Sequence, residues 1–267
     1  MKSKPETPVA YLERHAIFRL EDFTAAHRSP TRSAATIRSL LRYHVSTGRL
    51  RNVRRGLYAS AQKELDPWVL ASRLSSDAVL AYDGALSFHH LGGDDVRISF
   101  LTRQQVRPFT FEQVEYTPVR PPSSLGTRWR AEVIEVERAG EKVFVTSIER
   151  TLVDALDRLD LLRRSEDIDE IAEKLRRCFV SLDLDNSRMV THARNLGGGL
   201  LAARLGFLLE HLPNIRARDL ELLEKQRPRS PAYFDRTLRE EETMVFMRRW
   251  NLMVPKRLWL RVARGAT

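Results

Sequence analysis

Eight arginines lie between His27 and Tyr58, and this segment contains no aspartate or glutamate. Guanidinium groups donate paired hydrogen bonds to phosphate oxygens and to the guanine edge in the major groove of DNA. A segment with eight positive charges and no negative charge is therefore expected to bind a polyanion. The alternative interpretation is a solvated basic surface on an ordinary core, which is what most charge runs are.

The spacing of apolar residues predicts the elements that carry these arginines. Ser29 can cap a helix, and Pro30 suits its first turn, where the missing N–H has no cost. Gly48 is expected to end the helix, and the run from Leu50 to Tyr58, turned at Gly56, is typical of a β-hairpin. A helix followed by a basic hairpin predicts a winged helix-turn-helix. The apolar residues at helical spacing are Ala34, Ile37, Leu40, Leu41 and Val45.

The two faces of this predicted helix differ in chemistry on a helical wheel. The buried face is centred on Ile37 and includes Ala34, Leu40, Leu41 and His44. The opposite face is expected to contact base edges in the major groove through Arg32, Thr36, Ser39, Arg42 and Tyr43. The other arginines are expected to hold phosphates, and the hairpin tip could reach a minor groove: Arg28, Arg49, Arg51, Arg54 and Arg55.

An N-terminal domain of residues 1–62 is expected to contain these elements. Residues 1–60 carry a net charge of +8 from twelve basic and four acidic residues, which leaves +2 of the total +10 for the other 207 residues. A polyanion partner is therefore expected for this domain and not for the rest of the chain. Phe23, Ala26 and Leu12 are expected in its core. Its further predicted elements are a helix over residues 8–16, a strand over 17–20 that pairs with the hairpin, and a helix over 21–27.

Residues 63–267 are expected to form a larger mixed domain, so that the chain belongs to the α+β class. Asp66 is expected to cap a helix, and Asp83–Leu91 is predicted to form another. From Val96 to Val145, short apolar runs alternate with proline and glycine, which is typical of a small, mostly antiparallel sheet. Its expected strands are Val96–Leu101, Phe109–Phe111, Val114–Tyr116, Trp129–Val136 and Lys142–Val145.

A helical part is expected to follow this sheet. Thr146 and Glu149 fit a capping box, and Arg150 and Asp154, four residues apart, are expected to form an ion pair on the surface. The remaining predicted elements are helices over Asp167–Phe179, Asn186–Leu196 and Leu200–His211, a mixed segment over 213–243, and a closing strand over Trp250–Pro255.

Patterns that would indicate catalysis or a bound metal are weak. The histidines lack HxxxH and HExxH spacing, and the single cysteine, Cys178, excludes a zinc finger. Gly197–Gly199 lacks the lysine that follows the glycines of a phosphate-binding loop. No catalytic, metal-binding or cofactor-binding residue is therefore expected. The chain has no apolar N-terminal segment and no run of membrane length, which predicts a cytoplasmic protein.

Four segments also share their order and pattern with a known family. The hairpin Leu50–Tyr58 resembles the family's wing, and Asp66–Gly92 resembles the start of its second domain, with His90 at a usual glycine position. Val143–Leu156 is similar to its strand followed by Pro-Glu-Arg-Thr-Leu-x-Asp, with isoleucine in place of the proline, and Arg249–Leu258 is similar to its C-terminal strand. The chain therefore resembles the AbiEi family of type IV toxin–antitoxin antitoxins.

The resemblance implies a specific function. Members of the family bind inverted repeats in their own promoter through an N-terminal winged helix and repress transcription. Their C-terminal domain opposes a nucleotidyltransferase-like toxin, usually without a stable complex. Two alternatives stay open: a stand-alone regulator whose second domain senses a ligand or dimerises, and a DNA-targeted nuclease that uses Glu173.

Overall fold

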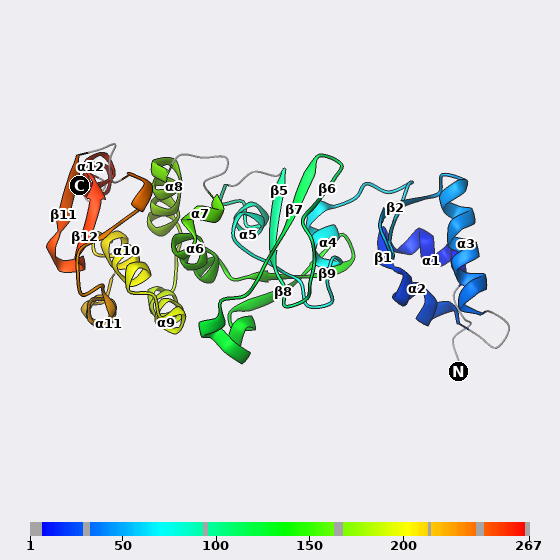
Figure 1. Cartoon of the computed structure of the whole chain (residues 1–267), viewed down its shortest axis with the longest axis horizontal. Coiled ribbons are helices and arrows are strands. Elements are labelled where there is room, and N and C mark those ends of the chain that lie inside the picture. The colour runs from blue at the N-terminus through cyan, green and yellow to red at the C-terminus, as the bar shows by residue number, and fades with distance from the viewer. Residues whose placement is uncertain are drawn as a thin grey trace.

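The computed structural model describes residues 7–28, 33–92, 96–162, 168–212, 215–238 and 243–264. These residues form helices and three separate sheets, which confirms a mixed α+β architecture. Along the long axis of the molecule, the N-terminal elements lie at one end, the central sheet lies in the middle, and the C-terminal strands lie at the other end (Figure 1).

The N-terminal end contains helices packed on a three-stranded antiparallel sheet in the order β1-β3-β2. Its core contains Tyr11, Phe18, Phe23, Ile37 and Leu41. This arrangement matches the expected helix, strand, helix, helix and hairpin. Its elements are α1 (Pro8–Arg14), β1 (Ile17–Arg19), α2 (Leu20–His27), α3 (Ala34–Ser46), β2 (Leu50–Arg54) and β3 (Leu57–Ser60).

The start of α3 differs from the prediction. Its N-cap is Ser33, whose hydroxyl accepts a hydrogen bond from the Thr36 backbone N–H at 3.2 Å. Ser29 and Pro30, the residues expected at this cap, lie outside the described residues. The prediction placed the cap four residues too early because two serines precede the apolar residues, and each has a hydroxyl that can cap a helix.

Two alanines that were expected in the core are exposed, namely Ala26, and Ala34 from the helical wheel. His44 on α3 is buried, as predicted, and His27 on α2 is buried although it was not predicted in the core. The ring of His27 stacks on Phe23 with 4.3 Å between the ring centres, and its Nδ1 lies 3.0 Å from the Phe23 carbonyl oxygen. The His27 ring can be buried because it packs on an aromatic ring and its Nδ1 has a hydrogen-bond partner. Hydropathy alone would predict an alanine at such a buried position.

The central sheet has six strands in the order β6-β7-β5-β4-β9-β8. Helix α4 leads into its first strand, α5 connects β4 to β5, and the short helix η1 connects β7 to β8. Asp66 caps α4, as predicted, by accepting hydrogen bonds from the N–H groups of Trp68 and Val69. The elements are α4 (Pro67–Ser72), β4 (Val79–Leu80), α5 (Asp83–Phe88), β5 (Arg97–Leu101), β6 (Phe109–Phe111), β7 (Val114–Val119), η1 (Ser123–Arg130), β8 (Val133–Arg138) and β9 (Glu141–Thr146).

The central sheet is mostly antiparallel, as predicted, since the pairs β4–β5, β6–β7 and β8–β9 are antiparallel. The pairs β4–β9 and β5–β7 are parallel; in the second case β6 takes the edge of the sheet and leaves the place beside β5 to β7. The strand β4 consists of only two buried residues, too few to show an alternating pattern. The strand predicted from Trp129 to Val136 begins only at Val133, since the residues before it form η1.

The C-terminal part consists of helices followed by a three-stranded sheet in the order β10-β12-β11. The predicted helices and the closing strand are present, whereas α11 and α12 were not predicted. The elements are α6 (Ile148–Asp157), α7 (Leu159–Leu162), α8 (Ile168–Ser181), α9 (Asn186–Leu196), α10 (Gly199–Leu209), α11 (Ala217–Gln226), β10 (Ala232–Tyr233), η2 (Arg236–Leu238), β11 (Met244–Met247), η3 (Arg248–Trp250), β12 (Leu252–Pro255) and α12 (Lys256–Arg264).

The N-terminal unit, residues 7–60, packs directly against the central sheet. Ile17 and Leu57 belong to the same hydrophobic cluster as Leu70 and Leu74, which lie on and just after α4. A hydrogen bond also crosses this interface, because Arg19 Nε donates to the Arg73 carbonyl at 2.9 Å. The boundary predicted between residues 62 and 63 is therefore crossed by a shared core.

Candidate nucleic-acid interface

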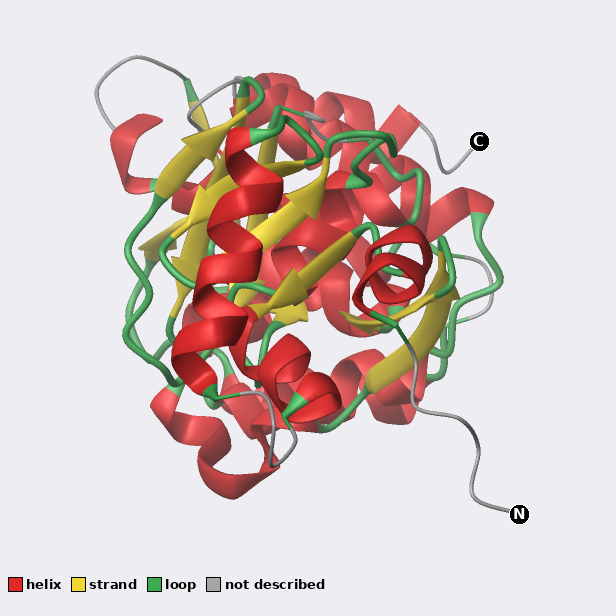
Figure 2. Ribbon diagram, turned by 90° about the vertical axis from the view of Figure 1, so that its right-hand side faces the viewer, coloured by secondary structure: helices red, strands yellow, loops and turns green. Residues whose placement is uncertain are grey.

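The outer face of α3 is exposed at the end of the molecule. Figure 2 faces this end, and α3 runs across its front. Thr36, Ser39, Arg42 and Tyr43 are all exposed, and 56% of the Tyr43 surface is accessible. The opposite face buries Ile37 and Leu41, as the wheel predicts. Arg32, the fifth residue predicted on the outer face, lies outside the described residues.

A hollow of about 600 Å³ lies beside α3, and we call it the arginine hollow. Its walls come from α3, from the β2–β3 turn, from the start of α2 and from the second domain. The structure brings Arg42, Arg54 and Arg55 together around it, as a shared role requires. Its described lining residues are Arg19, Leu20, Glu21, Arg38, Arg42, Arg54, Arg55, Gly56, Leu57, Tyr58, Arg73, Leu74 and Gln104.

Three of these arginines were not predicted as site residues. Arg38 precedes Arg42 by one helical turn, and this i, i+4 spacing was the signal that could have identified it. Arg19 lies at the end of β1 opposite Leu57 of β3, and this pairing places both residues in the lining of the hollow. Arg73 comes from the end of α4, and no local pattern indicates that it meets the N-terminal unit.

Burial and neighbouring charges both act on Arg19. Burial is the main cause that lowers the pKa of its guanidinium, and Arg73 and Arg54 lower it further. The carboxylates of Asp22 and Glu21 act in the opposite direction. For Arg19 itself, each carboxylate has a larger effect than either arginine, so burial, and not the neighbouring cations, accounts for the net lowering of its pKa.

The tip of the β2–β3 hairpin is hydrogen-bonded to the start of α2. The Gly56 carbonyl accepts a hydrogen bond of 2.8 Å from the Leu20 backbone N–H at the start of α2. Gly56 has a φ of +80°, a conformation that glycine adopts without strain. The guanidinium carbon of Arg54 lies 5.7 Å from the centre of the Phe109 ring on β6. The tip thus contacts both α2 and the central sheet, while Arg55 in its turn is exposed.

The other predicted phosphate-binding arginines lie in different surroundings. Arg51 is ion-paired with Glu112 of the central sheet and donates to the Ser60 carbonyl at 3.3 Å. Arg49 is exposed and lines a separate hollow of about 260 Å³ that also contains Glu13 and His44. Arg28 is exposed at the end of α2.

No protein-family model matches this chain, and no curated protein matches it.

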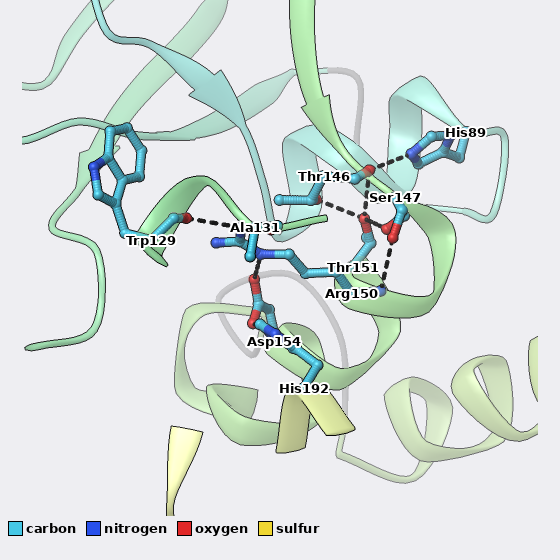
Figure 3. Close-up of polar contacts among 9 residues, drawn as sticks. All are labelled: His89, Trp129, Ala131, Thr146, Ser147, Arg150, Thr151, Asp154 and His192. Atoms are coloured by element: carbon cyan, nitrogen blue, oxygen red, sulfur yellow. Dashed lines mark hydrogen bonds and ion pairs between the residues drawn. The ribbon is translucent and has the colours of Figure 1, made fainter. Parts of the chain in front are cut away.

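A second polar cluster lies in the core of the second domain, where Arg150 is fully buried (Figure 3). Its Nε donates to Asp154 Oδ2 at 3.0 Å, and the other carboxylate oxygen, Oδ1, lies 2.7 Å from His192 Nε2. Its Nη1 donates to the carbonyls of Trp129 and Ala131 at 2.8 and 2.5 Å. The ion pair predicted on the surface is therefore buried, and it ties the end of η1 to α6 and α9.

The predicted capping box is also displaced by one residue. Ser147 caps α6, because its hydroxyl accepts from the Arg150 backbone N–H at 3.3 Å. The Thr146 hydroxyl instead lies 2.7 Å from the Thr151 hydroxyl inside the core. Glu149 faces Arg188, with 3.7 Å between Oε1 and Nη1. Each of these residues therefore has a partner within the fold.

The features that suggested other chemistry are helical or buried. Glu173, the residue named for the nuclease alternative, lies within α8 and so does not lie at a strand end, where a nuclease metal site needs its carboxylates. Cys178 is buried, and this burial raises the pKa of its thiol. Within the described ranges, no group of three or more potential ligands could hold a metal ion. The helices in these ranges are too short or too polar to span a bilayer.

Proposed function

We propose that the chain is a DNA-binding transcriptional repressor whose N-terminal unit is a winged helix-turn-helix. In this proposal α2 and α3 form the helix-turn-helix, α3 enters the major groove, and β2 and β3 form the wing. The observation that carries the proposal is that the exposed α3 face and the turn of the hairpin meet at one arginine-rich surface.

The residues divide into two proposed roles. Base edges are contacted by Thr36, Ser39, Arg42 and Tyr43, together with Arg32. Phosphates are held by Arg28, Arg49, Arg54 and Arg55, and by Arg38, which the structure adds. Arg51 is removed from this set, since its guanidinium is engaged by Glu112.

The resemblance to the AbiEi family supports a second proposal. The repressor is the antitoxin of a type IV toxin–antitoxin system in the cytoplasm. It regulates its own promoter at inverted repeats, and its second domain opposes a nucleotidyltransferase-like toxin without forming a stable complex with it. In this proposal the protein is not an enzyme and requires no cofactor.

DNA binding is tested by fluorescence anisotropy of the full chain on a duplex from its own upstream region and on a scrambled duplex. Replacing Arg54 and Arg55 by alanine should weaken both interactions and reduce the salt slope by about one phosphate for each arginine. Arg42→Ala should mainly reduce the preference for the upstream duplex, by roughly 1–3 kcal/mol if it contacts a guanine.

Two outcomes would count against this assignment. An unchanged salt slope in the Arg54→Ala/Arg55→Ala variant would remove the hairpin from the interface. An equal loss on both duplexes in Arg42→Ala would reduce that residue to a phosphate contact. The matched control is Arg218→Ala/Arg229→Ala, which removes the same charge from exposed positions of the second domain.

Antitoxin function is tested by co-expression with the product of the neighbouring gene. The shared core across residues 62 and 63 makes isolated fragments unsuitable, so the full chain is used. The full chain and the Arg42→Ala/Arg54→Ala/Arg55→Ala variant should both rescue growth, because neutralisation is assigned to the second domain. Rescue lost together with DNA binding would contradict that assignment.

A further inference from the structure

The arginine hollow has the size of a small-molecule site. Its volume of about 600 Å³ falls within the range of roughly 300–1,000 Å³ that such sites occupy. Among the described residues predicted to contact base edges, Arg42 lines it, whereas Thr36, Ser39 and Tyr43 do not. The hollow therefore lies at the flank of the proposed DNA-contacting face.

Positive charge in the hollow exceeds negative charge. Glu21 is the one acidic residue among its described lining residues. Arg73 is ion-paired with Glu141. Within the part of the chain that the structure describes, Arg38, Arg42 and Arg55 form no ion pair with a carboxylate. At least three guanidinium groups are thus available to an anion.

The hollow also offers apolar surface and a wall from a second part of the protein. Leu20, Leu57 and Tyr58 line it on the N-terminal side, and the Tyr58 ring stacks on Phe18 with 5.9 Å between ring centres. Leu74 and Gln104 line it from the second domain. Arginines beside leucines and an aromatic ring match a ligand that has both phosphates and a planar ring.

We propose that a soluble compact anion with two or more phosphate groups, such as a nucleoside polyphosphate, binds in the arginine hollow. Bound there, it occupies Arg42, Arg54 and Arg55 and so competes with DNA. This regulatory part rests on the proposed DNA-binding function. The hollow would then make the repressor responsive to a phosphorylated metabolite, without a change in the fold.

Binding is tested by isothermal titration calorimetry of the full chain with tripolyphosphate, with orthophosphate as the weaker comparison. We expect saturable one-site binding that weakens at least tenfold in Arg38→Gln/Arg55→Gln. The same titration of Arg218→Gln/Arg229→Gln should change less than twofold. Thermal unfolding of each variant verifies that it is folded. Non-saturable binding, or equal weakening in both double variants, would overturn the proposal, since either marks a general ionic effect.

Competition is tested by anisotropy on the upstream duplex, with sodium chloride added to match the ionic strength of tripolyphosphate. Tripolyphosphate should displace the duplex from the wild type beyond the salt control. DNA binding without saturable tripolyphosphate binding would overturn the proposed site, leave the proposed function standing and assign the hollow to the DNA backbone. Saturable binding that depends on Arg38 and Arg55, without any DNA binding, would support the site and overturn the proposed function.

Discussion

The guanidinium of Arg51 on β2 is ion-paired with the carboxylate of Glu112 in the turn between β6 and β7. The same guanidinium lies 5.9 Å from the centre of the Phe111 ring. This pair connects the hairpin of the N-terminal unit to the edge of the central sheet. The charge pattern alone assigns Arg51 to phosphate binding, whereas in the structure its guanidinium has a carboxylate partner within the protein.

Glu112→Gln should release Arg51 with little effect on stability. The side chains of the pair are 34% and 48% exposed, and pairs of this kind contribute only about 0–1 kcal/mol. The free energy of unfolding in urea should therefore fall by less than about 1 kcal/mol, whereas DNA affinity at low salt should rise. Glu135→Gln, which breaks the exposed pair with Lys142, serves as the control. Unchanged DNA affinity in Glu112→Gln would show that Arg51 does not reach DNA even when unpaired.

Arg150→Met should strongly destabilise the second domain. It leaves the Asp154 carboxylate buried without its cation, a change that typically costs about 3–5 kcal/mol. Arg158→Met removes an exposed pair with Asp160 and should cost under about 1 kcal/mol. Both values come from denaturant unfolding. A similar small loss in the two variants would mean that the buried cluster contributes little to stability.

Gly206→Ala should also destabilise the protein, by about 1–3 kcal/mol or more. A Cβ at this position would lie 2.2 Å from the ring of Trp250, which is fully buried. The clash disappears when the ring is removed, so Gly206→Ala should cost much less in a Trp250→Ala background. A double-mutant cycle in urea measures this coupling. Additive losses would show that the ring and residue 206 do not meet.

Stability of the N-terminal unit should decrease as the pH falls below about 7. Burial lowers the pKa of His44, and the charge of Arg49 lowers it further. The unfolded chain therefore binds a proton near pH 6.5, where the folded chain binds less, so that unfolding is favoured as the pH falls through this range.

The slope of unfolding free energy against pH between 7.5 and 5.5 should flatten in His44→Leu. A residual slope belongs to His89, whose pKa is lowered mainly by burial. His90→Asn is the control, because residue 90 is exposed and has a positive φ that asparagine tolerates. An unchanged slope in His44→Leu would exclude His44 as its source.

The local elements of the N-terminal unit were predictable because their signals lie within a few residues. The apolar spacing around Ile37 and Leu41 places α3 and its buried face, and Gly56 places the turn of the hairpin. The exposure of Thr36, Ser39, Arg42 and Tyr43 follows from the same periodicity.

The relationships between distant segments were not predictable in this way. Arg73 lies beside Arg19 because α4 packs against the hairpin. The two arginines are 54 residues apart in the sequence. The burial of Arg150 depends on carbonyls at the end of η1, a segment predicted as a strand. The i, i+4 spacing of Arg150 and Asp154 predicted their ion pair correctly. Spacing alone does not show whether such a pair is buried or exposed.

The cluster that joins Ile17 and Leu57 to α4 has a consequence for engineering. A chimera joined at residue 62 would leave these apolar side chains without their partners Leu70 and Leu74. The N-terminal unit therefore cannot be exchanged between proteins as an independent domain. A transplant to another protein would have to include α4 and the strands beneath it, so the proposed DNA preference is better tested by substitutions at single positions of α3.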